Sequence, residues 1–252
     1  MRNPTGQTSK KVSTKREAMR EKRRQQQRRQ RLIILLAVVA AALTIAGILI
    51  IPSLLPAGDI VTITPITRPM VDGRSMGDPN APVTIEVFED FQCPSCQNYS
   101  ENIEPRIVET YVASGQVYYV FRHFPFLDDN AVRKESDQAA NASMCAAEQN
   151  RFWEYHDIVF ANWKGENIGA YSDNRLVAFA ESIGLDMAAF NACFKENRYE
   201  SEINADLEKG RSFQVSGTPS VFVNGRILTP GFVPSFEQIS QAVDAALAEA
   251  GN

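Results

Sequence analysis

A pair of cysteines separated by two residues is the part of this sequence best suited to chemistry. The Cys-Pro-Ser-Cys motif at residues 93–96 follows the β-rich run Val83–Phe88 and precedes a stretch of helical spacing, Gln97–Ala113. The amides and the dipole at a helix N-terminus favour an anion. A thiolate at Cys93 is therefore stabilised, and it becomes both a nucleophile and a good leaving group. Cys96 lies one helical turn further on, close enough to close a small disulfide ring, so the pattern predicts thiol–disulfide exchange.

Two other interpretations of the motif remain open. The first is half of a zinc site, which needs four ligands and usually a second close pair of them. The remaining cysteines, Cys145 and Cys193, are far apart in the sequence, and neither His123 nor His156 stands at zinc-ligand spacing from a cysteine. We therefore expect no metal site. The second interpretation is an inert structural disulfide within the motif.

The elements that flank the motif predict a βαβ unit. Pro94 fits the first turn of the helix, where its missing N–H costs nothing, and Pro105 is expected to kink the same helix. A second β-rich run, Val117–Phe121, follows. Strand, helix and strand in this order predict a right-handed crossover between two parallel strands.

A helical block and a β-hairpin are predicted for the rest of the domain. Helical spacing extends from about residue 130 to residue 213, and β-rich runs return at residues 220–229. Asn224-Gly225 between these runs is a strong hairpin signal. Ser235, with a glutamine three residues later, makes a capping box for a last helix, Phe236–Ala250.

Charge is distributed unevenly along the chain of 252 residues, whose 44% hydrophobic content suits a globular protein. Residues 1–31 hold 12 of the 26 Lys and Arg and 2 of the 30 Asp and Glu, a net charge of +10. Because the whole chain has a net charge of −4, the remainder carries −14. Such an acidic body repels phosphate, which excludes nucleic acid as a partner.

An apolar segment separates the basic tail from the acidic body. Residues 32–51 contain no charged side chain, and a helix of that length spans about 30 Å, the hydrocarbon core of a bilayer. The apolar run and the tail before it are longer than those of a cleaved signal peptide. We therefore expect an uncleaved transmembrane helix at residues 32–51, anchored in the cell membrane. Because basic residues resist translocation, residues 1–31 are predicted to be a cytoplasmic tail and the domain to be extracytoplasmic.

Residues 52–82 are rich in proline and show no sustained hydrophobic period. We interpret them as a linker, with a short strand expected at Ile60–Thr64. The folded domain is then predicted to cover residues 83–252, which is long enough to bury a core of its own.

Four segments of the domain resemble the DsbA-like family of the thioredoxin superfamily: VTIEVFEDFQCPSC, RHFPF, FWEYHDIVFAN and VSGTPSVFVNG. The resemblance covers about residues 82–250. It implies an α/β thioredoxin fold with a helical insertion, at about 130–213, between the second strand and the cis-proline strand. It also implies thiol–disulfide exchange on proteins outside the cytoplasm, with a redox-active disulfide and no other cofactor.

The resemblance also implies roles for individual residues. Cys93 matches the attacking cysteine and Cys96 the resolving one. Pro219, preceded by Thr218, matches the family's cis-proline, which faces the active-site sulfur and helps to hold an extended substrate chain. From the residues alone, an ordinary trans turn at the start of a strand is the other interpretation of Pro219.

One departure from the family pattern concerns proton transfer. Many relatives carry a buried glutamate six residues before the first cysteine, and here that position is Val87, flanked by Glu86 and Glu89. Because strand side chains alternate, Glu86 and Val87 are expected to face opposite ways. Glu89 and Asp90 then remain as candidates for the relay.

A second departure is the inner dipeptide, Pro94-Ser95 instead of Pro-His. Without an imidazole beside the thiolate, we expect Cys93 to be a milder oxidant than the strongest family members, with Ser95 available as a hydrogen-bond donor.

The other cysteines and the histidines are expected to be structural. Cys145 and Cys193 lie in predicted helical segments of the insertion. Outside the cytoplasm an even cysteine count favours pairing. If Cys93 and Cys96 alternate between a disulfide with each other and two thiols, Cys145 and Cys193 are left to pair. We hypothesise a structural disulfide between them, with two buried free thiols as the alternative. Packing is the expected role of His123 and His156.

These features predict a membrane-anchored extracytoplasmic protein thiol–disulfide oxidoreductase, an oxidase that forms disulfides in exported proteins. Its partners would be unfolded or reduced exported proteins and, by family resemblance, a membrane quinone-linked reoxidase of the DsbB or vitamin K epoxide reductase (VKOR) type. A disulfide reductase or isomerase with the same site is one alternative. A non-enzymatic peptide-binding module or chaperone is another.

Overall fold

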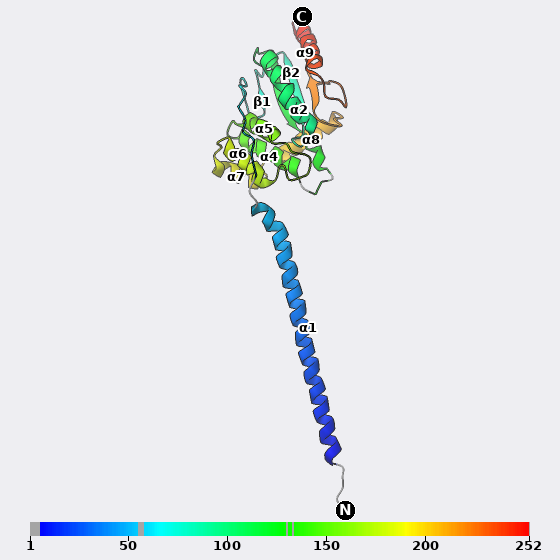
Figure 1. Cartoon of the computed structure of the whole chain (residues 1–252). Coiled ribbons are helices and arrows are strands. Elements are labelled where there is room, and N and C mark those ends of the chain that lie inside the picture. Colours follow the sequence, from blue (N-terminus) through cyan, green and yellow to red (C-terminus); the bar gives the residue numbers. More distant parts are fainter. Residues whose placement is uncertain (1–5, 55–57, 130, 133, 252) are drawn as a thin grey trace, which may run out of the picture. The chain divides into compact units, whose positions relative to one another are not determined.

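The computed structural model describes residues 6–54, 58–129, 131–132 and 134–251, which form two units. Helix α1 (Gly6–Leu54) makes the first unit, and the described strands all belong to the second (Figure 1). Among the described residues, no helix is both long and apolar enough to qualify as a membrane span. Beyond residue 45, most side chains of the predicted span at 32–51 lie outside the described part, as do residues 1–5 of the predicted tail.

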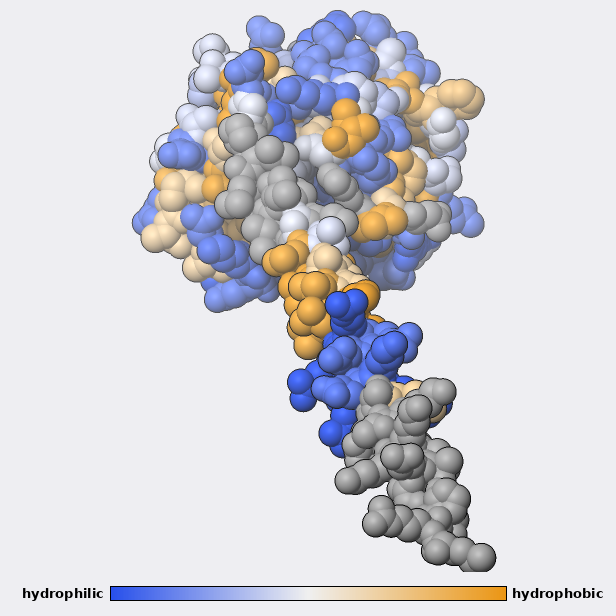
Figure 2. Space-filling view, turned by 60° about the horizontal axis from the view of Figure 1, so that its bottom comes forward, coloured by the Kyte–Doolittle hydropathy of each residue, from blue (hydrophilic) through white to orange (hydrophobic). Residues whose placement is uncertain are grey.

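Within α1, a hydrophilic stretch is followed by an apolar one (Figure 2). Leu32, Leu36 and Leu43 expose 61%, 59% and 67% of their surface. A continuous zone of exposed large apolar side chains is a mark of an interaction with a partner or a membrane.

A five-stranded mixed sheet forms the centre of the second unit, in the order β1-β3-β2-β4-β5. β2 and β3 are parallel, from the pair Val83 and Val117 to the pair Glu89 and His123, which confirms the predicted βαβ unit. The other strand pairs are antiparallel. The strands are β1 (Ser75–Met76), β2 (Val83–Glu89), β3 (Val117–His123), β4 (Ser220–Val223) and β5 (Arg226–Ile227).

Both faces of β2 are covered by apolar side chains, and each face has a core of its own. Val87 belongs to the main core, whereas Phe88, the next residue, packs with Phe124 in a smaller cluster. Gly210 of α8 (Glu200–Ser212) lies over this smaller cluster, where an added Cβ would stand 2.6 Å from the Phe124 ring. The strand that leads to the cysteines is therefore held from both sides.

Along the chain, helices α4 to α8 follow β3 and precede β4, and they form the predicted helical insertion (Figure 1). Residues 130 and 133, at the start of the predicted block, lie outside the described part. The remaining helices of the insertion and the last helix are α4 (Glu135–Ala147), α5 (Phe152–Ala161), α6 (Asp173–Ser182), α7 (Met187–Lys195) and α9 (Phe236–Ala250).

The helix that follows the cysteine motif is interrupted, where the sequence predicts one kinked helix. α2 (Pro94–Asn102) ends one residue before Ile103, α3 (Glu104–Ile107) begins after it, and a π-helical turn (Val108–Val112) continues the chain. Pro105 explains the break, because it lacks an N–H and its ring crowds the carbonyl four residues earlier.

The segment 58–68, which we call the N-terminal strap, packs on the domain although it falls in the predicted linker. The strand predicted at Ile60–Thr64 is wrong, since this segment has no strand pairing. Instead, the amide of Asn162 accepts from the N–H of Val61 and donates to its carbonyl, both at 2.8 Å. This single side chain satisfies the backbone groups that a neighbouring strand would otherwise pair. β1 also lies within the predicted linker and pairs with β3.

The hairpin and the last cap agree with their sequence signals. Asn224 and Gly225 have φ values of 44° and 77°, as the turn between β4 and β5 requires. Ser235 and Gln238 form the reciprocal capping box at the start of α9.

Candidate active site

Cys93 and Cys96 lie at the start of α2, as predicted from the strand–helix junction. Cys93 is the N-cap residue, and its carbonyl accepts from the N–H groups of Cys96 and Gln97. Both cysteines are free thiols in this structure and both are buried, Cys96 completely. Pro94 is exposed and Ser95 is half-buried, so the motif meets the surface at its two inner residues.

The pKa values of the two thiols are shifted in opposite directions. The pKa of Cys93 is lowered to about 6, first by the hydrogen bond from the Cys96 thiol and further by Thr218 and by the N–H groups of Cys96 and Ser95. Burial raises the pKa of Cys96 well above its ordinary value. At neutral pH Cys93 is therefore the more nucleophilic of the two thiols, and Cys96 needs a base before it can attack. Ser95 contributes through its backbone N–H.

The loop before β4 lies against Cys93. The Thr218–Pro219 peptide bond is cis, and the Cys93 thiol donates to the Thr218 carbonyl at 3.3 Å. The buried Thr218 hydroxyl has no hydrogen-bond partner among the described residues. It is thus free to donate to a thiolate at Cys93.

A buried glutamate lies behind Cys96, at a position shifted from the family pattern. Glu89 lies on the same face of β2 as Val87, and its side chain is buried. Glu86 lies on the opposite face, where it accepts from Arg122 at 2.7 Å and from Lys209 at 2.6 Å. Of the two acids that flank Val87, only Glu89 therefore reaches the cysteines.

The proton affinity of Glu89 is high. Burial raises its pKa well above the ordinary value, and the charges of Glu104 and Cys93 raise it further, while the contact with the Cys96 thiol acts in the opposite direction. Neither oxygen of Glu89 has a hydrogen-bond partner of normal geometry among the described residues. A carboxyl group of this kind is suited to exchange a proton with the neighbouring thiol.

Asp90, the other candidate acid, has a different position and different partners. Its carboxylate accepts from Ser136 Oγ at 2.5 Å and from the N–H groups of Gln92 and Leu127 at 2.9 and 3.1 Å. Burial raises the pKa of Asp90 to about 7. The Gln92 amide donates in turn to Asp128 at 3.1 Å. Asp90 thus fixes the loop before Cys93 to the helical insertion.

His156 occupies a polar position that its aromatic neighbours in sequence do not reveal. The ring is buried in the core, with Nδ1 2.9 Å from Asp157 and Nε2 3.7 Å from Glu104. Ligand atoms of Glu89, Glu104 and His156 all lie within 4.8 Å of one another. Because Arg68 already supplies a positive charge to Glu104 at 2.7 Å, we interpret this group as an acid–base cluster.

Sequence reasoning missed Arg68 and Glu104. One belongs to a proline-rich segment and the other to a broken helix, and neither position carries a local signal for burial. His123 is buried, with its ring against Phe91, Phe121 and Phe152, in the packing role that we expect for it.

The other two cysteines form a disulfide between α4 and α7. Cys145 and Cys193 are joined with a Cα–Cα distance of 5.7 Å. The cross-link ties together two helices of the insertion, and Cys93 and Cys96 are the free thiols of the chain.

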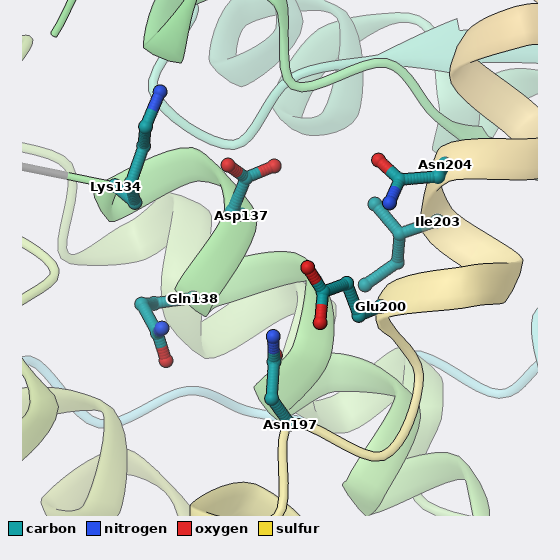
Figure 3. Close-up of a pocket in the computed structure, with 7 residues that line it drawn as sticks. All are labelled: Lys134, Asp137, Gln138, Asn197, Glu200, Ile203 and Asn204. Atoms are coloured by element: carbon teal, nitrogen blue, oxygen red, sulfur yellow. The ribbon is translucent and has the colours of Figure 1, made fainter.

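A hollow of about 230 Å³ lies in the insertion beside α4 and α8 (Figure 3). Its lining is largely polar and includes Lys134, Asp137 and Glu200. It contains no cysteine, so it is not part of the redox site.

The geometry defines a class of protein before any comparison: a thioredoxin-like sheet that presents two cysteines at a helix N-terminus opposite a cis-proline. A family model described as Thioredoxin matches residues 70–245. The chain therefore belongs to the DsbA-like thioredoxin family, and it is a thiol–disulfide oxidoreductase. This family uses redox-active cysteines and no cofactor.

Individual relatives agree with this assignment. The chain is 28% identical over 178 residues to a probable disulfide bond formation protein D of Bacillus cereus, covering 69% of this chain and 78% of that protein. The structure of oxidised BdbD from Bacillus subtilis matches with a TM-score of 0.63 and 21% identity, covering 76% of this chain and all of that one. A Na⁺/H⁺ antiporter NhaA 3 of Salinispora tropica is 35% identical over 174 residues, which are 69% of this chain but 24% of the antiporter. Only the shared domain is therefore compared in that case.

Proposed function

We propose that this protein is a membrane-anchored disulfide oxidase that forms disulfides in exported proteins outside the cytoplasm. The observation that carries the proposal is the contrast between its two thiols. Cys93 is an acidic thiol at a helix N-terminus beside Thr218 and Pro219, and Cys96 is a buried thiol of low acidity. This contrast supports Cys93 as the attacking and Cys96 as the resolving cysteine.

The proposed reaction has two exchange steps. A substrate thiolate attacks Cys93 of the Cys93–Cys96 disulfide, which forms a mixed disulfide and releases Cys96 as a thiolate. Cys96 takes a proton, for which Glu89 is the neighbouring donor. A second substrate thiolate then attacks the substrate sulfur of the mixed disulfide and displaces Cys93. The substrate loses two electrons and gains a disulfide, and the protein becomes a dithiol.

The direction of electron flow follows from the stability of the leaving thiolate. A thiolate stabilised at Cys93 favours the reduced protein and so makes the disulfide more oxidising. A pKa of about 6 at Cys93 is above the value of the strongest oxidants and below that of an ordinary cysteine. The names of the relatives, disulfide bond formation proteins, support the same direction.

The cis-proline loop is the proposed substrate-binding element. The Thr218 carbonyl lies 3.3 Å from Cys93 Sγ, and β4 starts directly after Pro219. An extended, unfolded chain that lies along this loop would bring its own thiol to Cys93. Folded proteins offer no such extended segment, so unfolded or reduced exported proteins are the proposed substrates.

Turnover needs an electron acceptor, because each cycle leaves Cys93 and Cys96 reduced. We propose a membrane quinone-linked reoxidase of the DsbB or VKOR type. The Cys93 thiolate would attack the disulfide of such a partner and form a mixed disulfide, and Cys96 would then displace the partner sulfur and restore the Cys93–Cys96 disulfide. The partner would be left as a dithiol, and its two electrons would pass to the quinone.

The proposed anchor is the apolar segment 32–51, with residues 1–31 in the cytoplasm and the domain outside it. The uncharged run, the basic residues before it and the exposed apolar side chains on α1 support this arrangement. Alkaline extraction of membranes that contain the full-length chain is the test. Retention in the membrane is expected, and release into the supernatant would contradict the anchor.

The redox function is tested with the full-length chain and a reduced, unfolded substrate that has two cysteines. The oxidised protein should transfer its disulfide to the substrate, Cys93→Ser should abolish the transfer, and Cys96→Ser should trap a mixed disulfide with the substrate. Substrate reduction by the dithiol form, with no oxidation by the disulfide form, would instead indicate a reductase. If Cys93→Ser still protected the unfolded substrate from aggregation, a peptide-binding chaperone would be indicated.

A further inference from the structure

Arg68 of the N-terminal strap reaches into the interior of the domain behind the redox motif. Its side chain is only 2% exposed, and it donates to Glu104 at 2.7 Å and to the two oxygens of Asp157 at 2.8 and 2.7 Å. Its guanidinium also lies 4.9 Å from the centre of the Trp153 ring. A buried charge held by this many partners is an organised part of the interior.

Several buried polar atoms behind Cys96 lack a hydrogen-bond partner among the described residues. Both oxygens of Glu89, Oε2 of Glu104 and Nε2 of His156 are buried without a hydrogen-bond partner in the described part of the chain. These three side chains lie within 4.8 Å of one another. A carboxyl group buried among unpaired acceptors holds its proton more strongly than one in solvent, in agreement with the raised pKa of Glu89.

Two carboxylates this close in the core cannot both be ionised without compensation. Arg68 contacts Glu104 but is not in hydrogen-bond contact with Glu89. The guanidinium therefore offsets part of the charge that Glu104 exerts on Glu89.

We infer that Arg68 offsets the charge of Glu104 at Glu89, so that Glu89 accepts the proton of Cys96 when Cys96 resolves a mixed disulfide. The inference rests on the proposed exchange function and assigns Arg68 as a positioning residue for it. Without the guanidinium, the charge of Glu104 would act on Glu89 in full and raise its proton affinity further. Glu89 would then keep its proton at neutral pH and could not act as a base.

The step is balanced as follows. Cys96 transfers its proton to Glu89, its sulfur attacks Cys93, and the Cys93–Cys96 disulfide forms. The bond from Cys93 to the partner sulfur breaks, and the partner leaves as a thiolate that takes up a proton from the solvent or from Glu89. The protein is oxidised by two electrons and the partner disulfide is reduced.

The other groups around the pair of Glu89 and Glu104 are compatible with this assignment. Hydrogen bonds from His156 and Arg68 lower the pKa of Asp157 to about 2 against the effect of burial, so Asp157 stays ionised. Burial raises the pKa of Tyr99 and Tyr119 far above their ordinary values, so both stay neutral. The titratable and charged groups that face the pair come from the strap, β3, α2 and α5, and they are Arg68, Tyr119, Cys93, Cys96, Tyr99, His156 and Asp157.

Asp157 also connects the cluster with solvent. Its side chain is 12% exposed and lines a surface hollow between the strap, α2 and α5. His156 lies between Asp157 and Glu104. Among the described residues, the cluster is therefore separated from solvent on this side by His156 and Asp157.

The test compares three variants of the full-length chain: Arg68→Met, Arg68→Lys and Arg74→Met. Arg74→Met is the matched control, because Arg74 also joins the N-terminal segment to the domain through ion pairs, but with the buried Asp206 and the exposed Glu202 of α8. Reduced protein is mixed with oxidised glutathione, quenched at intervals over a range of pH, and assayed for the mixed disulfide by mass. The rate of its conversion to the Cys93–Cys96 disulfide reports resolution by Cys96.

We expect Arg68→Met to move the pH profile of resolution upward by about one unit, a roughly tenfold slower step at neutral pH that is recovered at higher pH. Arg68→Lys and Arg74→Met should keep the profile of the original protein. Equal profiles for Arg68→Met and Arg74→Met would overturn the inference. Glu104→Gln should move the profile to lower pH, because it removes the charge that raises the proton affinity of Glu89.

A second measurement does not depend on exchange activity. The infrared carbonyl band of protonated carboxyl groups should correspond to one more protonated buried group in Arg68→Met than in Arg74→Met at neutral pH. An unchanged band would contradict the inference even if exchange is normal. Conversely, a protein that shows the band difference but exchanges no disulfide would refute the proposed function and leave intact the effect of Arg68 on the protonation of Glu89.

Discussion

Replacement of Cys96 by alanine tests the origin of the reactivity of Cys93. The pKa of Cys93 is lowered to about 6, and the hydrogen bond from Cys96 is the largest cause. A hydrogen bond to a charged group contributes about 1.5–3 kcal/mol, which corresponds to about one to two pH units. In Cys96→Ala we therefore expect Cys93 to titrate between about pH 7 and pH 8.

The titration can be followed by the ultraviolet absorbance of the thiolate and by the rate of alkylation. In Cys96→Ala the signal comes from Cys93 alone, because Cys145 and Cys193 are joined in a disulfide. Cys96→Ser is the matched control, since its hydroxyl still donates a hydrogen bond, and Cys93 should titrate near pH 6 as in the original protein. Equal midpoints in the alanine and serine variants would refute the role of this hydrogen bond and leave the helix N-terminus as the main cause.

The same acidity has a consequence for stability. Because the pKa of Cys93 is lower in the folded than in the unfolded protein, ionisation stabilises the reduced form above about pH 6, and this stabilisation is lost as the pH falls through that value. At about pH 7 it amounts to about 1.4 kcal/mol. In the disulfide form Cys93 cannot ionise. The free energy of unfolding should therefore rise with pH in this range for the reduced form and not for the disulfide form. The same measurement on Cys93→Ser should show no such rise.

Three further predictions concern the surroundings of the motif. Glu89→Gln should slow the resolution of a glutathione mixed disulfide by about a hundredfold and retain alkylation of Cys93, which a quenched mass assay can check; unchanged resolution would exclude Glu89 as the base. Replacing Cys145 and Cys193 together by alanine should lower the unfolding free energy by about 4 kcal/mol without loss of exchange, as measured by denaturant titration, and a loss of exchange in folded protein would show that this disulfide does more than stabilise. Gly210→Ala should cost about 1–3 kcal/mol, because the new Cβ would lie 2.6 Å from Phe124; a melting temperature equal to that of the original protein would contradict this packing.

The parts of the site that the sequence predicts are those with local signals. The order of strand, motif and helix identifies Cys93 and Cys96 because helix-terminus chemistry acts over a few neighbouring residues. Asn224-Gly225 and the capping box at Ser235 are local in the same sense. Pro219 needed the family resemblance, since a trans turn fits the same residues.

The parts that the sequence does not predict depend on contacts between distant segments. Arg68 pairs with Glu104, 36 residues away, and with Asp157, 89 residues away. The prolines around the strap lead to the interpretation of a linker, and they give no signal that this segment packs on the domain. The side-chain amide of Asn162, 101 residues from Val61, supplies the missing backbone partners, and no local pattern marks such a side chain.

The position of the buried acid follows from strand geometry and not from a fixed spacing to the cysteine. The family's spacing of six residues points to Val87, whereas the alternation of side chains along β2 allows Glu89. A strand advances about 3.3 Å per residue and returns to the same face every second residue. Moving the acid from position 87 to position 89 therefore keeps it on the face of β2 that looks toward α2 and shifts it by about 6.6 Å toward the cysteines. Moving it by one residue, to Glu86, turns it to the opposite face, where Arg122 and Lys209 bind it. Parity along the strand, rather than distance from the motif, thus decides which acid can act on Cys96. The new position also places the carboxyl next to Glu104, which couples its protonation to Arg68 and so to the strap.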